Sequence, residues 1–241
     1  MASVIFEDAA LTLGVTMSQP ESPSKIILLQ PADSSAKITD IVEAIIADIM
    51  ENSEINVVGL NDSLFLACSS INMATEIAKV YVDDIDISEL EIPGIGKVSA
   101  VSAHLTQKQA GEYSALAEQE DKNMTDIADQ TISVSRASTF ERLLTITLLR
   151  LAKYDKVKIV AAGGSINDAI ELALKLTGGQ ISKDPVGIKL FHLYSIIMRN
   201  DPTKSIAAVS IYLQKGVTTR YTKRQSAVLK EVSSINAINK K

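Results

Sequence analysis

The chain has 241 residues, of which 46% are hydrophobic, 22% charged and 4% aromatic. This composition excludes a wholly disordered chain, and the length suffices for two cores of about 100 residues each. The formal net charge of −5 hides a division, because residues 1–125 carry 6 basic and 20 acidic side chains and residues 126–241 carry 18 and 9. We expect the two halves, at −14 and +9, either to meet different partners or to attract each other.

The sequence contains one cysteine, Cys68, which excludes an intramolecular disulfide and a cysteine-rich metal site. No apolar run reaches the roughly 18 residues of a membrane-spanning helix. Glu7 and Asp8 stand where a signal peptide would carry basic residues. These features predict a cytoplasmic protein with no membrane partner.

A helical pattern in the first half of the chain returns in the second half. Apolar side chains recur at helical spacing over residues 38–49, and the same spacing appears 102 residues later over residues 140–151. Ser138 and Glu141 predict a capping box at the start of the second of these helices.

The same shift of 102 continues through the next elements. Residues 55–58 and 157–160 are rich in β-branched side chains and predict a strand in each copy. A polar or glycine-containing turn follows at residues 61–63 and at residues 163–165. A second amphipathic helix then begins in each copy.

One strand precedes the first helix of each copy, and two strands follow the second helix. The last strands share the phrase Ala-Val-Ser at residues 100–102 and 208–210, where the shift has grown to 108. The second copy has therefore gained about six residues, most simply in a longer third strand and hairpin around residues 199–204.

Each copy thus predicts the order β-α-β-α-β-β, and the fold class is α/β, an α+β sandwich of two tandem modules forming a pseudo-dimer. The predicted parts, in chain order, are an N-terminal arm (1–24), an acidic first module (25–108), a polar connector able to form a short helix (109–129), a basic second module (130–216) and a basic tail or terminal helix (217–241).

The order of elements, and the passage from strand through a glycine turn into a helix over residues 157–169, resembles the Alba family of archaeal chromatin and RNA-binding proteins. The second copy is the closer match. The resemblance implies that a dimer-like pair of modules binds DNA or RNA with little sequence preference. It also implies basic residues after the first strand, at the turn after the second strand, and along a long hairpin between the third and fourth strands.

The two copies meet this pattern unequally. The second offers Arg136 after its first strand and Arg199 with Lys204 in its hairpin, whereas the first has Asn61 and Asp62 at the turn and a shorter hairpin. The predicted nucleic-acid contacts all belong to the second module or the tail: Arg136, Gly163, Gly164, Ser165, Arg199, Lys204, Arg220, Lys223 and Arg224.

Two kinds of contact are combined in this set. The Lys and Arg side chains would release counterions from phosphates, unless they are ordinary solvated charges or pair with the acidic half. The turn at residues 163–165 could direct backbone N–H groups at a phosphate. It lacks the Gly-Lys-Ser/Thr of a Walker motif, so a plain tight turn is the simpler interpretation.

Other chemistry-bearing residues predict structural roles. His104 and His192 occupy unmatched positions, Cys68 falls on the buried face of its helix, and Asp83, Asp84 and Asp86 are expected to form a solvated edge. No Ser/His/Asp arrangement or metal-spaced cluster emerges. We therefore expect no enzymatic activity, no cofactor and no metal site.

The leading hypothesis is a nucleic-acid-binding protein of low sequence specificity, associated with the nucleoid if its ligand is DNA. The alternative is a protein-interaction or structural subunit that has kept the Alba-like fold and lost nucleic-acid binding. In the first case the acidic module is a dimerisation partner or a regulator, and a protein partner would bind through it. The sequence leaves open whether the pseudo-dimer assembles into larger homo-oligomers.

Overall fold

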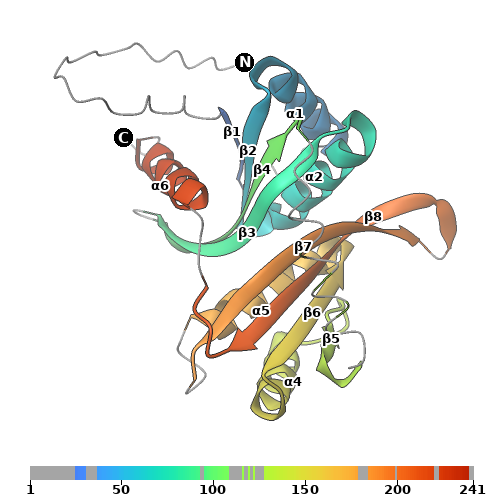
Figure 1. The fold of residues 1–241 in the computed structure, drawn as a ribbon, viewed down its shortest axis with the longest axis vertical. Helices are drawn as coiled ribbons and strands as arrows, with labels where there is room; N and C mark the ends of the chain where they lie inside the picture. Colours follow the sequence, from blue (N-terminus) through green and yellow to red (C-terminus); the bar gives the residue numbers. More distant parts are fainter. Residues whose placement is uncertain are drawn as a thin grey trace.

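A computed structural model describes residues 25–30, 37–92, 95–108, 128–178, 184–198, 200–219 and 223–238, and the single residues Leu116, Gln119 and Lys122. The predicted arm at residues 1–24 and nearly all of the predicted connector at 109–129 lie outside this part. The described residues form two four-stranded sheets and five α-helices (Figure 1). The predicted class of two tandem α/β modules is therefore confirmed.

The first module has its strands in the order β1-β2-β4-β3, with β1 parallel to β2 and the other neighbours antiparallel. Its elements are β1 (Lys25–Leu29), α1 (Ile38–Asn52), β2 (Glu54–Leu60), the 3-10 turn η2 (Asn61–Ser63), α2 (Leu64–Ala78), β3 (Tyr81–Ile92) and β4 (Gly96–Thr106).

The second module repeats this topology as β5-β6-β8-β7, so both copies have the predicted element order. Its elements are η3 (Ala128–Gln130), β5 (Thr131–Ser133), α4 (Phe140–Lys153), β6 (Lys156–Ala162), η4 (Gly163–Ser165), α5 (Ile166–Thr177), β7 (Val186–Met198) and β8 (Asp201–Lys215). Even the β-bulges correspond, since the register shifts around Asp83 in β3 and around Lys189 in β7.

The first helix of the second module tolerates a buried polar residue because its hydroxyl has a partner. Thr147 of α4 is buried, and its Oγ1 donates a hydrogen bond to the Leu143 carbonyl oxygen at 2.7 Å. The predicted capping box is wrong: the N-cap residue is Thr139, and it makes no side-chain capping bond. Ser138 instead belongs to the preceding turn, where its Oγ lies 3.2 Å from Ser135 Oγ.

The six residues gained by the second copy are mostly not in the hairpin. Ser102 of β4 pairs with Asp86 of β3, and Ser210 of β8 pairs with His192 of β7. The shift between equivalent positions is therefore 106 in the third strands and 108 in the fourth. Four of the extra residues precede β7, where the sequence offers nothing to align, and two lie in the hairpin.

The two modules pack through their second helices and third strands. Helix α2 contacts α5, β7 and β8, and β3 lies beside β7 (Figure 1). The Phe65 amide of α2 donates to Asn167 Oδ1 at 2.8 Å, and Asn167 Nδ2 donates to the Asp62 carbonyl at 3.4 Å. Positions 65 and 167 are equivalent in the repeat, so this contact lies at the pseudo-twofold axis, as in an isologous dimer interface.

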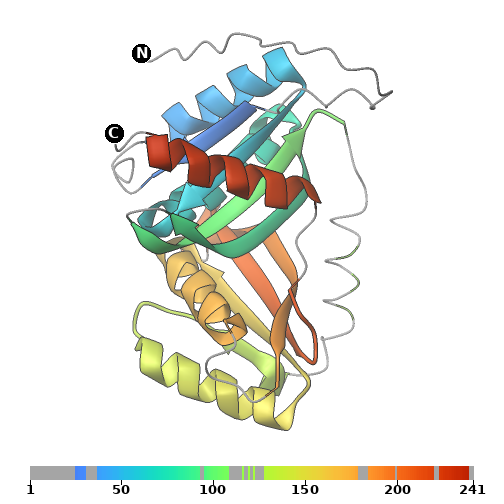
Figure 2. The same ribbon diagram turned by 90° about the vertical axis from the view of Figure 1, so that its left-hand side faces the viewer.

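Helix α6 (Lys223–Ile238) crosses back to the first module and lies on the face of its sheet opposite α1 and α2 (Figure 2). Its buried Val228, Leu229 and Val232 form a cluster with apolar side chains of the sheet. The sheet side of that cluster consists of Val58, Leu60, Leu90, Ile92, Val98 and Ala100. Part of the predicted basic tail is therefore a docked helix.

Candidate nucleic-acid interface

Two helices of the second module begin at the same edge of its sheet. Strands β5 and β6 are parallel, so their carboxyl ends meet at one edge, and α4 and α5 start beyond them. Arg136 follows β5, and the turn η4 follows β6. The topology thus brings together two sites that the sequence predicted separately.

The η4 turn requires a left-handed residue at its first position. Gly163 has φ +58°, and its equivalent in the first module, Asn61, has φ +46°. Glycine and asparagine are the residues that adopt this conformation with least strain. The turn predicted from the sequence is therefore present in both copies.

Arg136 lies directly over this turn. A Cβ atom at Gly164 would overlap Nη2 of Arg136 and stand 3.2 Å from its Cζ, so the absence of a side chain at Gly164 gives the guanidinium its place. Arg136 is exposed, whereas Ser165 is buried. A cation therefore sits at the amino end of α5, whose own dipole is positive there.

The hairpin of the second module extends past this edge. The last pair of β6 joins Ala162 to Ala208, so residues 195–198 of β7 and 201–207 of β8 continue beyond it. We call residues 195–198 and 201–207 the hairpin arm. Its Ile206 reaches to 4.0 Å from the Cβ position of Gly163, which places the arm beside η4 and Arg136.

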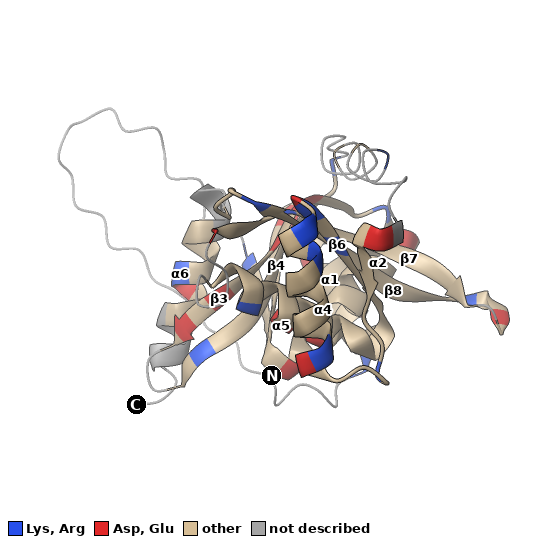
Figure 3. Ribbon diagram, turned by 90° about the horizontal axis from the view of Figure 1, so that it is seen from below, with Lys and Arg blue, Asp and Glu red and all other residues tan. Residues whose placement is uncertain are grey.

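Lys204 is the predicted contact that the structure describes on the arm. Its side chain is 70% exposed, and its Nζ lies 2.9 Å from Asp201 Oδ2. Hydrogen bonds from Thr203 and then Lys204 lower the pKa of the Asp201 carboxyl. Basic and acidic residues therefore stand together at the tip of the arm (Figure 3).

The remaining predicted contacts lie outside the described residues wholly or in part. Arg199 and Arg220 are not described. Lys223 and Arg224 stand in the first turn of α6, and their side chains are not described.

A difference in charge between the modules, on the sheet face opposite α1 and α2 or α4 and α5, was not predicted from the sequence. Lys156 and Lys158 of β6 point to this face, and Lys158 Nζ lies 5.3 Å from the ring centroid of Tyr212. The equivalent positions on β2 hold Glu54 and Asn56. The alternation of lysine with apolar residues over residues 156–159 was the available signal.

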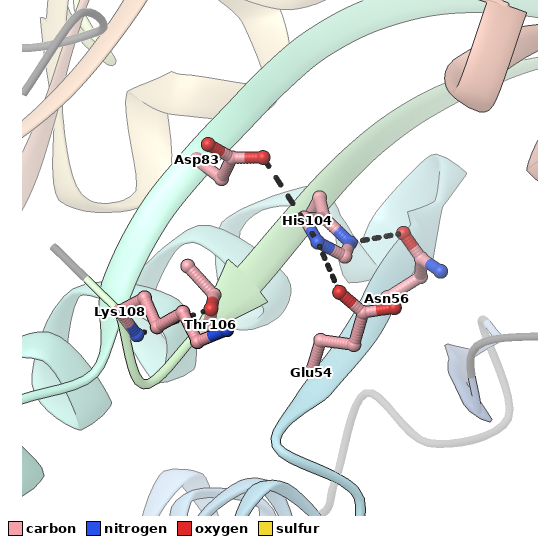
Figure 4. Close-up of polar contacts among 6 residues, drawn as sticks. All are labelled: Glu54, Asn56, Asp83, His104, Thr106 and Lys108. Carbon is pink, nitrogen blue, oxygen red and sulfur yellow. Dashed lines mark hydrogen bonds and ion pairs between the residues drawn. The ribbon is translucent and has the colours of Figure 1, made fainter. Parts of the chain in front are cut away.

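On the first module this face holds a buried histidine among acidic groups (Figure 4). His104 is 4% exposed; its Nδ1 lies 3.2 Å from Asn56 Oδ1, and its Nε2 lies 3.5 Å from Glu54 Oε2 and 4.0 Å from Asp83 Oδ2. This position fits the structural role predicted for His104. Among the described residues no group of His, Cys, Asp and Glu is arranged to hold a metal ion.

The prediction of a solvated acidic edge is wrong for Asp86. The pKa of this carboxyl is raised to about 7, chiefly by burial; the hydrogen bond from the Ile87 amide partly offsets the increase, and the nearby Asp84 adds to it. Cys68 lies in the core as predicted, and burial raises the pKa of its thiol to about 12.

The ion pairs between described residues each lie within one module. Apolar packing and hydrogen bonds join the described parts of the modules. Among these residues the charge difference between the halves therefore forms no ion pair across the interface.

The similarity of this chain to known proteins is limited. No family model matches the chain, and no curated protein matches it. Within the described residues, no helix has the length and apolar character needed to cross a membrane. Among solved structures the chain is similar to the crystal structure of ALBA1 from Trypanosoma brucei, with 18% identity over 46% of this chain and 86% of that chain, and a TM-score of 0.31.

Proposed function

We propose that this protein binds DNA or RNA with little sequence preference through the edge of the second module that carries Arg136, the η4 turn and the hairpin arm. The observation that carries the proposal is the exposed Arg136 guanidinium held over Gly164 at the start of α5. A cation beside the positive end of a helix dipole is unfavourable until an anion binds between them. A backbone phosphate supplies that anion, and its oxygens accept paired hydrogen bonds from a guanidinium.

The groups on this edge favour contacts with the nucleic-acid backbone over contacts with bases. The contacts proposed here are cations and backbone amides, which position a nucleic acid without reading its sequence. The arm adds Lys204 and extends past the sheet, so it can follow a strand or duplex. The proposed contacts also include four residues whose side chains are not described: Arg199, Arg220, Lys223 and Arg224.

The first module serves in this proposal as the pseudo-dimer partner. Its equivalent turn holds Asn61 and Asp62 in place of Gly163 and Gly164, and the Asp62 carboxylate would repel phosphate. The Alba resemblance supports the overall scheme, with a cytoplasmic protein that is associated with the nucleoid if the ligand is DNA. The proposal includes no catalytic step.

Two lysines give a matched test of the proposed surface. Lys204 and Lys97 each stand on a hairpin, are 70% and 61% exposed, and pair with a carboxylate of the same hairpin. We expect Lys204→Gln to weaken binding to all sequences and to reduce the salt slope by about 1, whereas Lys97→Gln leaves both unchanged. Equal effects of the two substitutions would overturn the assignment to the second module.

Gly164→Ala tests the Arg136 contact separately. The added methyl group must displace the end of a flexible side chain, so we expect an almost unchanged melting temperature. Affinity for nucleic acid should fall by several-fold, as in Arg136→Gln, since a charge-assisted hydrogen bond contributes about 1.5–3 kcal/mol when fully formed. If Gly164→Ala binds nucleic acid with wild-type affinity, the position of Arg136 over Gly164 no longer supports the proposal.

A second candidate function is protein binding. Ile196 and Ile197 of the arm are 36% and 70% exposed, and apolar side chains in such a position favour a protein partner. A stable partner recovered after nuclease treatment and a high-salt wash, together with absent nucleic-acid binding, would favour this function over the first.

A further inference from the structure

Helix α2 of the acidic module holds the hairpin arm of the basic module through four polar side chains. We call this group the cross-module clamp: Asn72 and Glu76 on α2, and Ser195 and Ser205 on the arm. The two side chains on α2 precede the two on the arm by at least 119 residues, and together the four bridge the two modules.

The Glu76 carboxylate is the common acceptor of the clamp. The Ser195 hydroxyl donates to Oε1, and the Ser205 hydroxyl lies 3.3 Å from Oε2. Asn72 Nδ2 donates to Ser195 Oγ at 2.5 Å and lies 3.2 Å from Glu76 Oε1. Because Ser195 is on β7 and Ser205 on β8, one carboxylate holds both strands of the arm.

The pseudo-twofold axis provides an internal comparison. The repeat places Gly178 at the position equivalent to Glu76, and Leu174 at that of Asn72. The strand pairing places Glu89 at the position of Ser195. On that side Glu89, Leu174 and Gly178 line a cavity of about 220 Å³, and the Glu89 carboxylate accepts a hydrogen bond from Lys97 of its own hairpin at 3.0 Å.

Among the described residues the clamp therefore runs in one direction, from the acidic module to the basic arm. The corresponding hairpin of the first module is covered differently, because Leu90, Ile92 and Val98 pack under α6. Each hairpin thus has its own support, and in the described part of the chain it is the arm of the second module that is held by a carboxylate of the other module.

We propose that Glu76 is a positioning residue that fixes the hairpin arm relative to Arg136 and the η4 turn, so that the acidic module sets the geometry of a phosphate-binding surface on the basic module. The effect on nucleic-acid binding rests on the proposed function, whereas the hold of Glu76 on the arm rests on the clamp geometry alone. Without the clamp, the part of the arm beyond β6 is free to rotate away from η4. Phosphate contacts on the arm and at Arg136 then no longer act together.

Hydrogen exchange of the full chain tests the mechanism without any ligand. Glu76→Ala and the double variant Ser195→Ala/Ser205→Ala should each raise the exchange rates of arm amides at least about fivefold, because several hydrogen bonds are lost together. Glu76→Gln keeps an acceptor oxygen and should retain most of the protection. Glu43→Ala, on the exposed face of α1, removes the same charge and should leave the arm unchanged.

Binding to a duplex of about 20 base pairs tests the consequence. Loss of one negative charge strengthens binding slightly in Glu43→Ala and in Glu76→Ala alike, so only loss of the clamp can make Glu76→Ala bind several-fold more weakly. Unchanged arm exchange in Glu76→Ala would overturn the clamp. If Glu76→Ala shows faster arm exchange but binds with the same affinity as Glu43→Ala, the role of Glu76 in positioning is overturned. If the wild type does not bind the duplex, the proposed function is overturned, and the exchange result still decides whether the clamp exists.

Discussion

Removing the apolar contacts of α6 should release this helix from the first module without unfolding either sheet. Leu229 and Val232 are buried against the outer face of β3 and β4. A Leu→Ala change in a core costs about 2–5 kcal/mol, and the smaller loss at a Val position brings the double change Leu229→Ala/Val232→Ala to about 3–6 kcal/mol. Because α6 is a single helix that packs on one face of the sheet, this cost exceeds the free energy that holds the helix in place.

Hydrogen exchange with mass spectrometry measures the effect directly. Amides of α6 should lose protection, while amides of β2 and β4 keep theirs and the main melting transition persists. Release also uncovers the apolar side chains of the sheet, so binding of a hydrophobic dye should increase. Ala227→Ser and Glu231→Ala change exposed positions of the same helix and should have no effect. Retained protection of α6, or loss of protection throughout the first module, would refute the reasoning.

Three further changes test the energetics of the fold. Ser70→Ala should raise the free energy of unfolding by about 1 kcal/mol, because the buried Ser70 hydroxyl has no hydrogen-bond partner among the described residues; a loss of stability in urea titration would contradict this. Asn167→Ala should cost about 0.5–2 kcal/mol, since the Phe65 amide at the start of α2 loses its acceptor, and an unchanged urea midpoint would show that the cross-module contact contributes nothing. Asp86→Asn should flatten the pH dependence of the melting temperature: the folded pKa of about 7 lies above the ordinary value of 3.8, so the stability linked to the neutral carboxyl is complete below about pH 4 and is lost as pH rises through about 7. A constant difference between variant and wild type over that range would be the contrary result.

The fold was accessible from the sequence because its signals are local and occur twice. Helical spacing over residues 38–49 and 140–151, and β-branched runs at residues 55–58 and 157–160, recur at one shift of 102. Each copy therefore supports the assignment of the other. The left-handed position shared by Asn61 and Gly163 has the same origin in the repeat.

Features that depend on contacts between elements could not be predicted from the sequence. The position of Arg136 over Gly164 needs the parallel pairing of β5 and β6, and the burial of Asp86 needs its neighbours on the sheet. Glu76 has no distinguishing pattern around it, since its partners Ser195 and Ser205 lie far away in the chain. The division of six extra residues between a loop and the hairpin likewise required the strand register.

The surfaces of the two modules differ more than their cores do. Lys156 and Lys158 replace Glu54 and Asn56 at equivalent positions of β6 and β2, while the apolar positions between them are kept. These positions lie on the sheet face that points away from the core helices, so substitutions there can change the surface without changing the fold. This divergence is consistent with one module meeting the ligand and the other supporting it.

The salt dependence of nucleic-acid binding tests the central proposal most directly. The basic positions proposed as contacts are Arg136, Arg199, Lys204, Arg220, Lys223 and Arg224. If they neutralise about six phosphates of a duplex, the slope of log affinity against log salt is about −5, and affinity falls about 10³-fold between 50 and 200 mM salt. We predict measurable binding to unrelated DNA or RNA sequences at 50 mM salt, with a steep loss at the higher concentration. Absence of binding at 50 mM, or an affinity that does not change with salt, would contradict the proposal.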